Sequence, residues 1–301
     1  MPTPVAISSR PRPPRSSTSC GPRRADRKPV SERLDLVALT DAAEAAARAG
    51  GAIVAAGFDH PSNVREKAPG DWVSDVDHAS EEAVRSALAW SAPGIPFFGE
   101  EGGGERAEFG WICDPLDGTA NFLHRFPAVG VSVALVADGV PVVGVVHAPL
   151  LGDTYRAAAG DGAWCNGRRL AVSARPPAQA IVATGFPFRR KDLVDDYLAR
   201  FAAAFGAFED LRRAGAASLD LAWTAAGVFD GYFELALGPW DVAAGALLVR
   251  EAGGVVTDWA GDPDRWLGSG DIVVGAPAVH ARILGIVVGS PGSGPGADKI
   301  G

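Results

Sequence analysis

Four of the carboxylates in the stretch FGEEGGGERAEFGWICDPLD are candidates for one site. Glu100 and Glu101 stand on a glycine-rich segment, and Asp114 and Asp117 follow a short apolar run that indicates a buried strand. Like charges this close cannot all stay ionised without a compensating cation. Because all four side chains offer oxygen, with no His or Cys among them, the cluster favours Mg²⁺ or Mn²⁺ over zinc.

The residues between and after the two aspartates predict a bend that aims the site. Pro115 fixes its own φ, and Gly118 permits a tight turn. The carbonyl of Leu116 would then face the same point as the carboxylates, with the hydroxyl of Thr119 beside it. More than two carboxylates around one turn indicate more than one metal ion, the arrangement that clamps attacking and leaving oxygens in phosphoryl transfer.

Each acid also has a purely structural explanation when it is taken alone. Two glutamates before glycines are typical of a solvated turn, and DPLDGT fits a type I turn. Asp77 and Asp241 stand near the starts of predicted helices, where an aspartate often serves as a cap. The metal-site interpretation therefore depends on these acids meeting in the fold.

The elements that must position the acids fall into two halves. In the first half, helices are expected over 31–58 and 74–94, the second capped by Asp77 or Ser80, beside an antiparallel sheet. The clearest hairpin signal is Asp138–Gly139 between two apolar runs. In the second half, strands and helices alternate. Helices are expected over 191–206, 217–227, 240–252 and 278–288, and strands over 180–185, 229–234, 255–259 and 271–277.

Composition bounds the class of protein and its partners. The chain has 301 residues, of which 47% are hydrophobic, enough for one substantial core or two modest domains. A net charge of -8 disfavours nucleic acid or an anionic membrane as the main partner. No apolar run approaches the ~18 residues of a membrane helix. Three sparse cysteines suit a reducing cytoplasm, where we expect the protein to reside.

Four regions are expected along the chain. Residues 1–32, rich in Pro, Arg and Ser, are interpreted as a disordered extension, with a targeting segment or a mis-assigned start as alternatives. Residues 33–178 form an N-terminal α+β region that carries the metal-binding loops. Residues 179–287 form a C-terminal α/β region with Asp241 and a substrate-binding segment, and 288–301 are a flexible tail.

Three motifs resemble, in order, the signatures of the inositol monophosphatase family. They are GEE at 99–101, DPLDGTANF at 114–122 and WDVAAGALLVREAGG at 240–254, and the similarity extends from about residue 34 to 285. GDWVSDVD, HRFP, GAWCNG and TGFPF add to it. The resemblance implies an α/β fold, the αβαβα five-layer sandwich of the inositol monophosphatase and fructose-1,6-bisphosphatase type. It also implies a Mg²⁺-dependent, lithium-sensitive phosphomonoesterase.

The resemblance further implies which residues hold the metal. Glu100, Asp114 and the carbonyl of Leu116 would bind a first Mg²⁺, and Asp114, Asp117 and Asp241 a second. Glu100 would contact a third ion through water, and Mn²⁺ is a substitute. At the head of a helix, Asp241 would cap and ligate at once.

The mechanism implied by the resemblance is in-line attack on phosphorus by a metal-activated water. Glu100 and Thr119, the latter hydrogen-bonded to Asp77, would orient or deprotonate that water. Backbone N–H groups of Gly118 and Thr119 would hold phosphate oxygens. His124 is expected to have a structural role.

Substrate contacts implied by the resemblance come from several segments. Glu234 would accept a hydroxyl of the polyol. In RRAGAAS, where family members commonly have a hydroxyl residue after the glycine, this chain has Ala216, which removes one possible hydrogen bond to inositol. The whole expected set is Asp117, Gly118, Thr119, Gly215, Ala216, Glu234 and Asp241.

The leading hypothesis is hydrolysis of inositol monophosphate, and of other sugar or polyol phosphates, to the free alcohol and inorganic phosphate. Fructose-1,6-bisphosphatase and histidinol-phosphatase are alternatives of the same chemistry, and nucleotide 3′-phosphatase is disfavoured by Ala120–Phe122 after DGT. An alternative of another class is a regulatory protein that binds RNA polymerase or RNA on this fold. The expected partner is a small-molecule phosphate monoester, and relatives suggest a homodimer.

Overall fold

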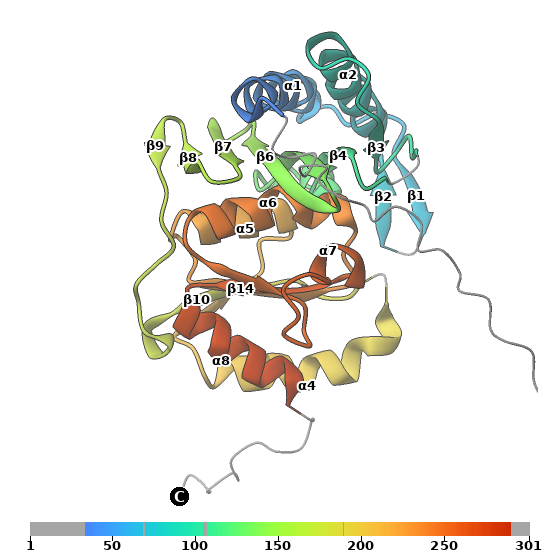
Figure 1. Cartoon of the computed structure of the whole chain (residues 1–301). Helices are drawn as coiled ribbons and strands as arrows, with labels where there is room; N and C mark the ends of the chain where they lie inside the picture. The colour runs from blue at the N-terminus through green and yellow to red at the C-terminus, as the bar shows by residue number, and fades with distance from the viewer. Residues whose placement is uncertain (1–33, 69, 105–106, 189, 290–301) are drawn as a thin grey trace, which may run out of the picture.

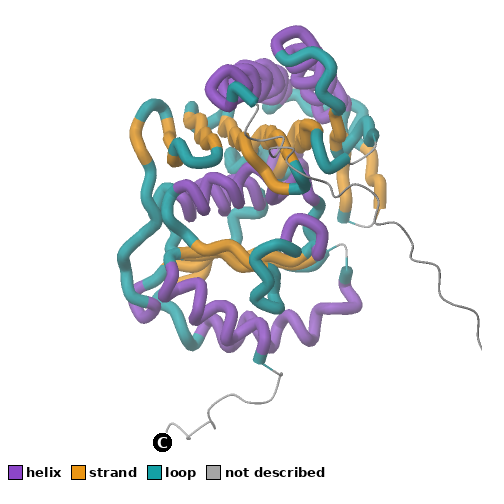
Figure 2. The backbone as a smooth tube through the Cα atoms, viewed as in Figure 1, coloured by secondary structure: helices purple, strands orange, loops and turns teal. Residues whose placement is uncertain are grey.

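The protein is a sandwich of five alternating helical and sheet layers. The structure is a computed structural model that describes residues 34–68, 70–104, 107–188 and 190–289. From one end of the molecule to the other, Figure 1 shows a helix pair, a sheet, a second helix pair, a second sheet and a third helix pair. The same alternation appears as purple and orange bands in Figure 2. The expected α/β fold with αβαβα layers is therefore confirmed.

The first layer consists of α1 (Leu36–Gly57) and α2 (Asp75–Ser91), which pack side by side. The side chain of Asp35 caps α1 by accepting the N–H of Ala38. The cap of α2 is Ser74, so the prediction of Asp77 or Ser80 was wrong. Asp77 instead occupies the third helical position and accepts the backbone N–H of Ser74, because a carboxylate there can reach back to the cap.

The second layer is a seven-stranded sheet in the order β3-β4-β5-β6-β7-β8-β9. All its pairs are antiparallel except β3 with β4. Asp138 and Gly139 both have positive φ, which is the geometry of a tight hairpin, so the predicted hairpin is confirmed. The strands are β3 (Phe97–Gly99), β4 (Gly110–Asp117), β5 (Gly130–Ala137), β6 (Val140–Ala148), β7 (Asp153–Ala158), β8 (Gly162–Cys165) and β9 (Arg168–Arg169).

The third layer contains α5 (Ala217–Ala225) and α6 (Pro239–Glu251), which lie between the two sheets. Because both faces of this layer are covered, these helices are buried nearly all round. Small residues allow α6 to pack closely against the first sheet. A Cβ on Gly144 of β6 would lie 2.8 Å from the carbonyl oxygen of Ala244 in α6.

The fourth layer is a five-stranded sheet in the order β11-β10-β12-β14-β13. Its first three strands are parallel, and β14 runs antiparallel to both of its neighbours. The fifth layer, α4 (Val194–Phe205) and α8 (Pro277–Val288), covers its outer face. The strands are β10 (Ile181–Thr184), β11 (Asp210–Arg212), β12 (Gly231–Leu235), β13 (Val255–Thr257) and β14 (Asp271–Gly275).

Several short elements are absent from the sequence prediction. They are β1 (Arg65–Ala68), β2 (Asp71–Val73), α3 (Thr119–Leu123), α7 (Trp266–Ser269), the strand β11 and the 3-10 turn η2 (Pro177–Gln179). The helix predicted over 191–206 begins with a 3-10 turn, η3 (Lys191–Leu193), before α4. The helix α8 extends through Val288, one residue into the predicted tail. Residues 290–301 of that tail and the extension predicted over 1–32 lie outside the described residues.

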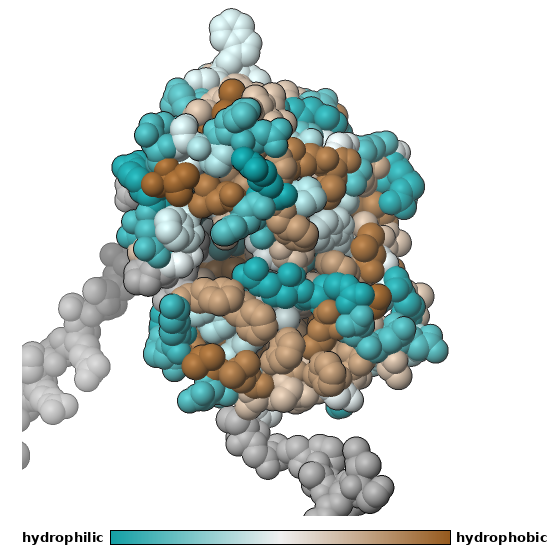
Figure 3. Space-filling model, turned by 180° about the vertical axis from the view of Figure 1, so that it is seen from behind, coloured by the Kyte–Doolittle hydropathy of each residue, from teal (hydrophilic) through white to brown (hydrophobic). Residues whose placement is uncertain are grey.

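Three apolar clusters fill the spaces between the layers. The largest joins Ile112 and Val146 of the first sheet to Leu221 and Tyr232 of the second half, so the two halves share a core. The predicted division at residue 178 falls between β9 and β10. The division of the chain into two regions at this point is still a prediction. Seen from behind, the surface intermixes hydrophilic and hydrophobic side chains (Figure 3). None of the described helices has both the length and the apolar character needed to cross a membrane.

The contact between β6 and α6 gives a prediction about stability. Gly144→Ala should lower the free energy of unfolding by about 1–3 kcal/mol, because the added methyl group meets the α6 backbone. Gly285→Ala is the matched control. Gly285 lies in α8, and a Cβ added there would have no neighbouring atom within 4 Å. The control substitution should therefore stabilise the protein by about 0.5–1 kcal/mol through helix propensity. Equilibrium denaturation in urea measures both, and equal effects would contradict the close packing of these layers.

Candidate active site

The site begins with an irregularity in β4. Asp114 pairs with Ser132 of β5, but Asp117, three residues later, pairs with Gly130, only two residues back. The strand therefore contains one extra residue, a β-bulge. Residues three apart in a regular strand point to opposite faces, so the bulge lets Asp114 and Asp117 face the same side.

The bulge is held from outside and from within. The Ser80 hydroxyl of α2 donates to the carbonyl of Pro115 at 2.8 Å. The backbone N–H of Leu116 donates to Oδ1 of Asp114 at 2.9 Å. At the end of the bend, Gly118 has a φ of 87°, a left-handed conformation that favours glycine. The predicted bend is thus present, with the proline and the glycine in the expected places.

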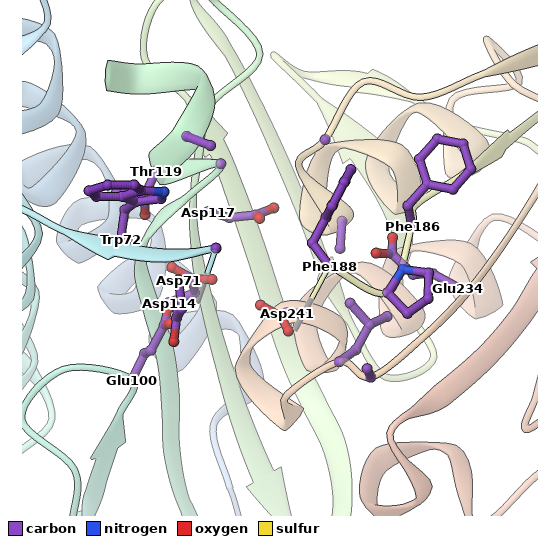
Figure 4. A pocket seen from close by; sticks show the side chains of 18 of the residues that line it. Asp71, Trp72, Glu100, Asp114, Asp117, Thr119, Phe186, Phe188, Glu234 and Asp241 are labelled. Atoms are coloured by element: carbon purple, nitrogen blue, oxygen red, sulfur yellow. The ribbon is translucent and has the colours of Figure 1, made fainter. Parts of the chain in front are cut away.

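Three carboxylates meet above this bulge. Carboxylate oxygens of Asp114, Asp117 and Asp241 lie within 4.8 Å of one another, and all three residues are buried. Asp241 comes from α6, more than a hundred residues further along the chain. Figure 4 shows the three carboxylates facing one space. The fold therefore brings together the acids that were predicted to form the second metal site.

Burial and mutual repulsion oppose the ionisation of these acids. Burial raises the pKa of Asp114 well above its usual range, and the neighbouring carboxylates of Glu100, Asp117 and Asp241 raise it further. A divalent ion would remove that penalty by pairing with the ionised carboxylates. The donors are buried oxygen atoms from two elements, which fits Mg²⁺ or Mn²⁺. The geometry and the donor chemistry therefore both suit a hard metal ion.

Glu100 belongs to the same cavity but is held by a cation of the chain. Lys67 Nζ lies 3.1 Å from Oε1 of Glu100 and 2.7 Å from Oε1 of Glu101. Burial lowers the pKa of Lys67, but the two glutamates outweigh it and raise the pKa above its usual range. Glu100 is not within the three-carboxylate group, and Glu101 is not among the residues that line the cavity.

Glu81 fixes the loop that carries Glu100, and sequence reasoning missed it. Its carboxylate accepts the backbone N–H groups of Glu101 at 2.9 Å and Gly102 at 2.8 Å. A Cβ on Gly99 would lie 2.2 Å from this carboxylate, so a larger residue there would displace the Glu81 side chain. The available signal was a charged residue on the buried stripe of α2, four residues after Asp77.

The predicted contact of Thr119 with Asp77 is present. The Thr119 hydroxyl lies 3.1 Å from Oδ1 of Asp77 and 3.1 Å from the carbonyl of Leu116. The other oxygen of Asp77 accepts the N–H and hydroxyl of Ser74. Burial raises the pKa of Asp77, and the hydrogen bonds from Ser74 and Thr119 oppose this without cancelling it. Asp77 thus ties the start of α2 to Thr119.

Asp117 and Asp241 are each anchored at the start of a helix. Asp241 stands at the third position of α6, and its Oδ2 accepts the backbone N–H of the cap residue Gly238 at 2.6 Å, so the expectation that Asp241 itself caps the helix was wrong. Oδ2 of Asp117 accepts two hydrogen bonds from Ser218 in the first turn of α5. Ser218 was missed from the sequence, because its partner lies 101 residues away.

The carboxylates form the floor of a cavity of about 150 Å³. Most expected substrate residues line it, but Ala216 is not among the lining residues and is buried, with its methyl group against Gly118. The walls carry Trp72 on one side and Phe186 and Phe188 on the other (Figure 4). The expected residues that line the cavity are Glu100, Asp114, Leu116, Asp117, Gly118, Thr119, Gly215, Glu234 and Asp241.

A family model described as Inositol monophosphatase family matches residues 35–291. Among curated proteins, the "Putative Nus factor SuhB" of Neisseria meningitidis serogroup B is 46% identical over 254 residues, covering 83% of this chain and 97% of that protein. The "Nus factor SuhB" of Escherichia coli K12 is 42% identical, covering 79% of this chain and 91% of that protein.

Solved structures give the same result. The extragenic suppressor protein suhB from Bartonella henselae matches with a TM-score of 0.78 and 35% identity, covering 83% of this chain and 98% of that one. The inositol monophosphatase from Anabaena (Nostoc) sp. PCC 7120 matches with a TM-score of 0.77 and 34% identity, covering 86% and 98%.

The acidic cluster gives a prediction about pH and metal. In the metal-free protein the pKa of Asp114 is raised on folding, so its contribution to stability is present at low pH and is lost as the pH rises above about 4. The side chain of Asn cannot ionise. Without metal, Asp114→Asn should therefore become increasingly more stable than the wild type as the pH rises.

Mg²⁺ should reverse that order. A saturating concentration, about 100 times the dissociation constant, should stabilise the wild type by about 2.7 kcal/mol and the variant by much less. Thermal unfolding over a pH series, with chelator or with Mg²⁺, measures both effects. A wild type that Mg²⁺ does not stabilise would contradict the metal site.

Proposed function

The chain belongs to the inositol monophosphatase family, and on that premise we propose that it is a Mg²⁺-dependent phosphomonoesterase. Its substrate would be inositol monophosphate or a related ring-shaped polyol phosphate, cleaved to the free alcohol and inorganic phosphate. The observation that carries the proposal is the group of three buried carboxylates at the floor of a cavity. Such a group has little structural use without a cation, and with one it becomes a binding site for phosphate.

The residues proposed to hold Mg²⁺ are those that the geometry favours. Asp114, Asp117 and Asp241 form one set, with Glu100 and the carbonyl of Leu116 lining the same cavity. When bound, Mg²⁺ would neutralise the phosphate charge and lower the pKa of a coordinated water. We propose that two or three Mg²⁺ ions bind, and that Mn²⁺ can replace them.

The side chains around the ions would orient the attacking water. Thr119 approaches Asp77 at 3.1 Å, so its hydroxyl proton can be directed there while its lone pairs remain for a hydrogen bond from water. Lys67 Nζ lies 3.1 Å from Oε1 of Glu100, and Glu100 lines the cavity. Acceptance of a proton from the water is the role proposed for this carboxylate.

The cavity walls support a ring-shaped alcohol as the leaving group. Glu234 lines the cavity and offers an acceptor to a hydroxyl, and the Tyr232 hydroxyl holds its Oε2 at 2.5 Å. Trp72 and Phe188 are 36% and 50% exposed at the mouth, where a flat ring face would cover them. A few polar groups among apolar walls are typical of small-molecule sites and suit a cyclic polyol.

Fructose-1,6-bisphosphatase and histidinol-phosphatase stay alternatives within this chemistry. A second phosphate would require a cation at the wall, and Arg213 lines the cavity. A kinetic panel with inositol 1-phosphate, fructose 1,6-bisphosphate and histidinol phosphate separates the three.

A second candidate function is regulatory, with RNA polymerase or RNA as the partner. The observation that favours it is the name "Nus factor SuhB" of the similar proteins. That name weighs against the expectation, based on a net charge of -8, that nucleic acid is not a partner. The two functions do not exclude one another, because a regulatory surface can lie outside the cavity. Cytoplasmic location and a homodimer stay predictions.

Release of phosphate tests the enzymatic proposal directly. The full chain should release inorganic phosphate from inositol 1-phosphate with Mg²⁺, stop with chelator, and be inhibited by Li⁺. Asp241→Asn should lower kcat/KM by about 100-fold or more, because it removes a carboxylate from the metal set. Asp258→Asn, a buried aspartate at the end of β13, is the control and should keep activity if the variant folds. An inactive wild type, or a fully active Asp241→Asn, would refute the proposal.

The proposed role of Glu234 predicts a change in substrate binding. Glu234→Gln should raise KM for inositol 1-phosphate by about tenfold with kcat little changed, because a hydroxyl loses a charged acceptor in both ground and transition states. Glu209→Gln, an exposed acid outside the cavity, is the matched control. An unchanged KM in Glu234→Gln would remove this residue from the substrate site.

A further inference from the structure

One oxygen of Asp117 has two donors from a single residue. Ser218 donates its backbone N–H to Oδ2 of Asp117 at 2.7 Å and its hydroxyl to the same oxygen at 2.5 Å. Ser218 is fully buried, so water cannot replace its hydroxyl. Hydrogen bonds to a buried carboxylate are shorter and stronger than those between neutral groups. The rotation of the Asp117 carboxylate is therefore restricted by Ser218.

The neighbouring strand leaves space for this hydroxyl. Gly130 of β5 is the register partner of Asp117, and a Cβ on it would lie 2.9 Å from Oγ of Ser218. A side chain at position 130 would therefore displace the hydroxyl from its present place. Three residues from β4, β5 and α5 form one arrangement around a single carboxylate oxygen.

A second contact ties the same two segments together. The side-chain amide of Asn121 lies 2.9 Å from the carbonyl of Ala214 and 3.3 Å from that of Gly215. The end of β4 and the helix α3 are thus attached at two points to the stretch 214–218, which includes the start of α5. That stretch supplies Gly215 and Ala217 to the cavity wall. A movement of the Asp117 carboxylate would therefore be transmitted to the substrate side of the cavity.

We propose that Ser218 is a positioning residue for the metal cluster, and that it couples metal binding to the shape of the substrate wall. Its hydroxyl fixes one oxygen of Asp117, so the carboxylate is held in one orientation before a metal arrives. Residues behind a ligand change metal affinity by about 10- to 100-fold when they are removed. This inference rests on the proposed function, since it takes Asp117 to be a metal ligand.

The first experiment measures metal binding without catalysis. Binding of Mn²⁺ to the full chain is followed by electron paramagnetic resonance for the wild type, Ser218→Ala and a control. Ser218→Ala keeps the backbone N–H bond and loses the hydroxyl bond, so Mn²⁺ should bind about tenfold more weakly. The control, Thr224→Val, removes a buried hydroxyl from the same helix that donates only to the carbonyl of Asp220, and should bind Mn²⁺ like the wild type.

A second variant reaches the same hydroxyl from the opposite side. Gly130→Ala leaves Ser218 in the sequence but places a methyl group against its Oγ, so Mn²⁺ affinity should fall by about as much as in Ser218→Ala. In steady-state assays both variants should need more Mg²⁺ for half-maximal activity. Their KM for inositol 1-phosphate should also rise at saturating Mg²⁺, an effect that a loss of stability alone would not produce.

The possible results separate this inference from the proposed function. If folded Ser218→Ala binds Mn²⁺ as tightly as the wild type, the positioning role is wrong. If the wild type binds Mn²⁺ but releases no phosphate, the proposed function fails, and the affinity ratio still decides the role of Ser218. If the wild type binds no Mn²⁺, both are refuted. Thermal unfolding without metal confirms that each variant is folded.

Discussion

Repulsion among buried carboxylates is the constraint on which the rest of this structure depends. Asp114, Asp117 and Asp241 place oxygens within 4.8 Å of one another in surroundings that exclude most water. Ionised together they destabilise the fold, and the neighbouring Glu100 adds to the effect. The same repulsion is a source of affinity for a divalent ion, because binding removes it. The arrangement that would bind a metal ion for the proposed function therefore lowers the stability of the metal-free protein.

The layered fold supplies the framework that opposes this repulsion. The bulge in β4 turns two aspartates to one side, and α6 brings the third across the interface between the sheets. Each carboxylate is then held by a hydrogen-bond donor, which is Leu116 for Asp114, Gly238 for Asp241 and Ser218 for Asp117. Because the donors come from both halves of the chain, the site depends on the core that the halves share.

Much of the framework could be predicted, and the reasons are local. The strands β5 and β6 are continuous apolar runs, and Asp138–Gly139 between them adopts the turn that these residue types favour. Glu100, Asp114, Asp117 and Asp241 were predicted as ligands from the resemblance, and the three aspartates meet in the fold. Short or exposed strands such as β1 and β11 could not be predicted, because their pairing depends on neighbours rather than on their own pattern.

The positions that could not be predicted share one property: their role depends on distant partners. In the sequence, nothing distinguishes Glu81 from other charged helical residues, because its role depends on a contact with the loop at Gly102. Ser218 likewise cannot be distinguished from an ordinary residue in the first turn of a helix. The most direct test of the central claim is diffraction from Mn²⁺-soaked crystals at the manganese edge. Anomalous peaks should lie among Asp114, Asp117 and Asp241. An empty cluster in crystals of protein that binds Mn²⁺ in solution would contradict the proposed site.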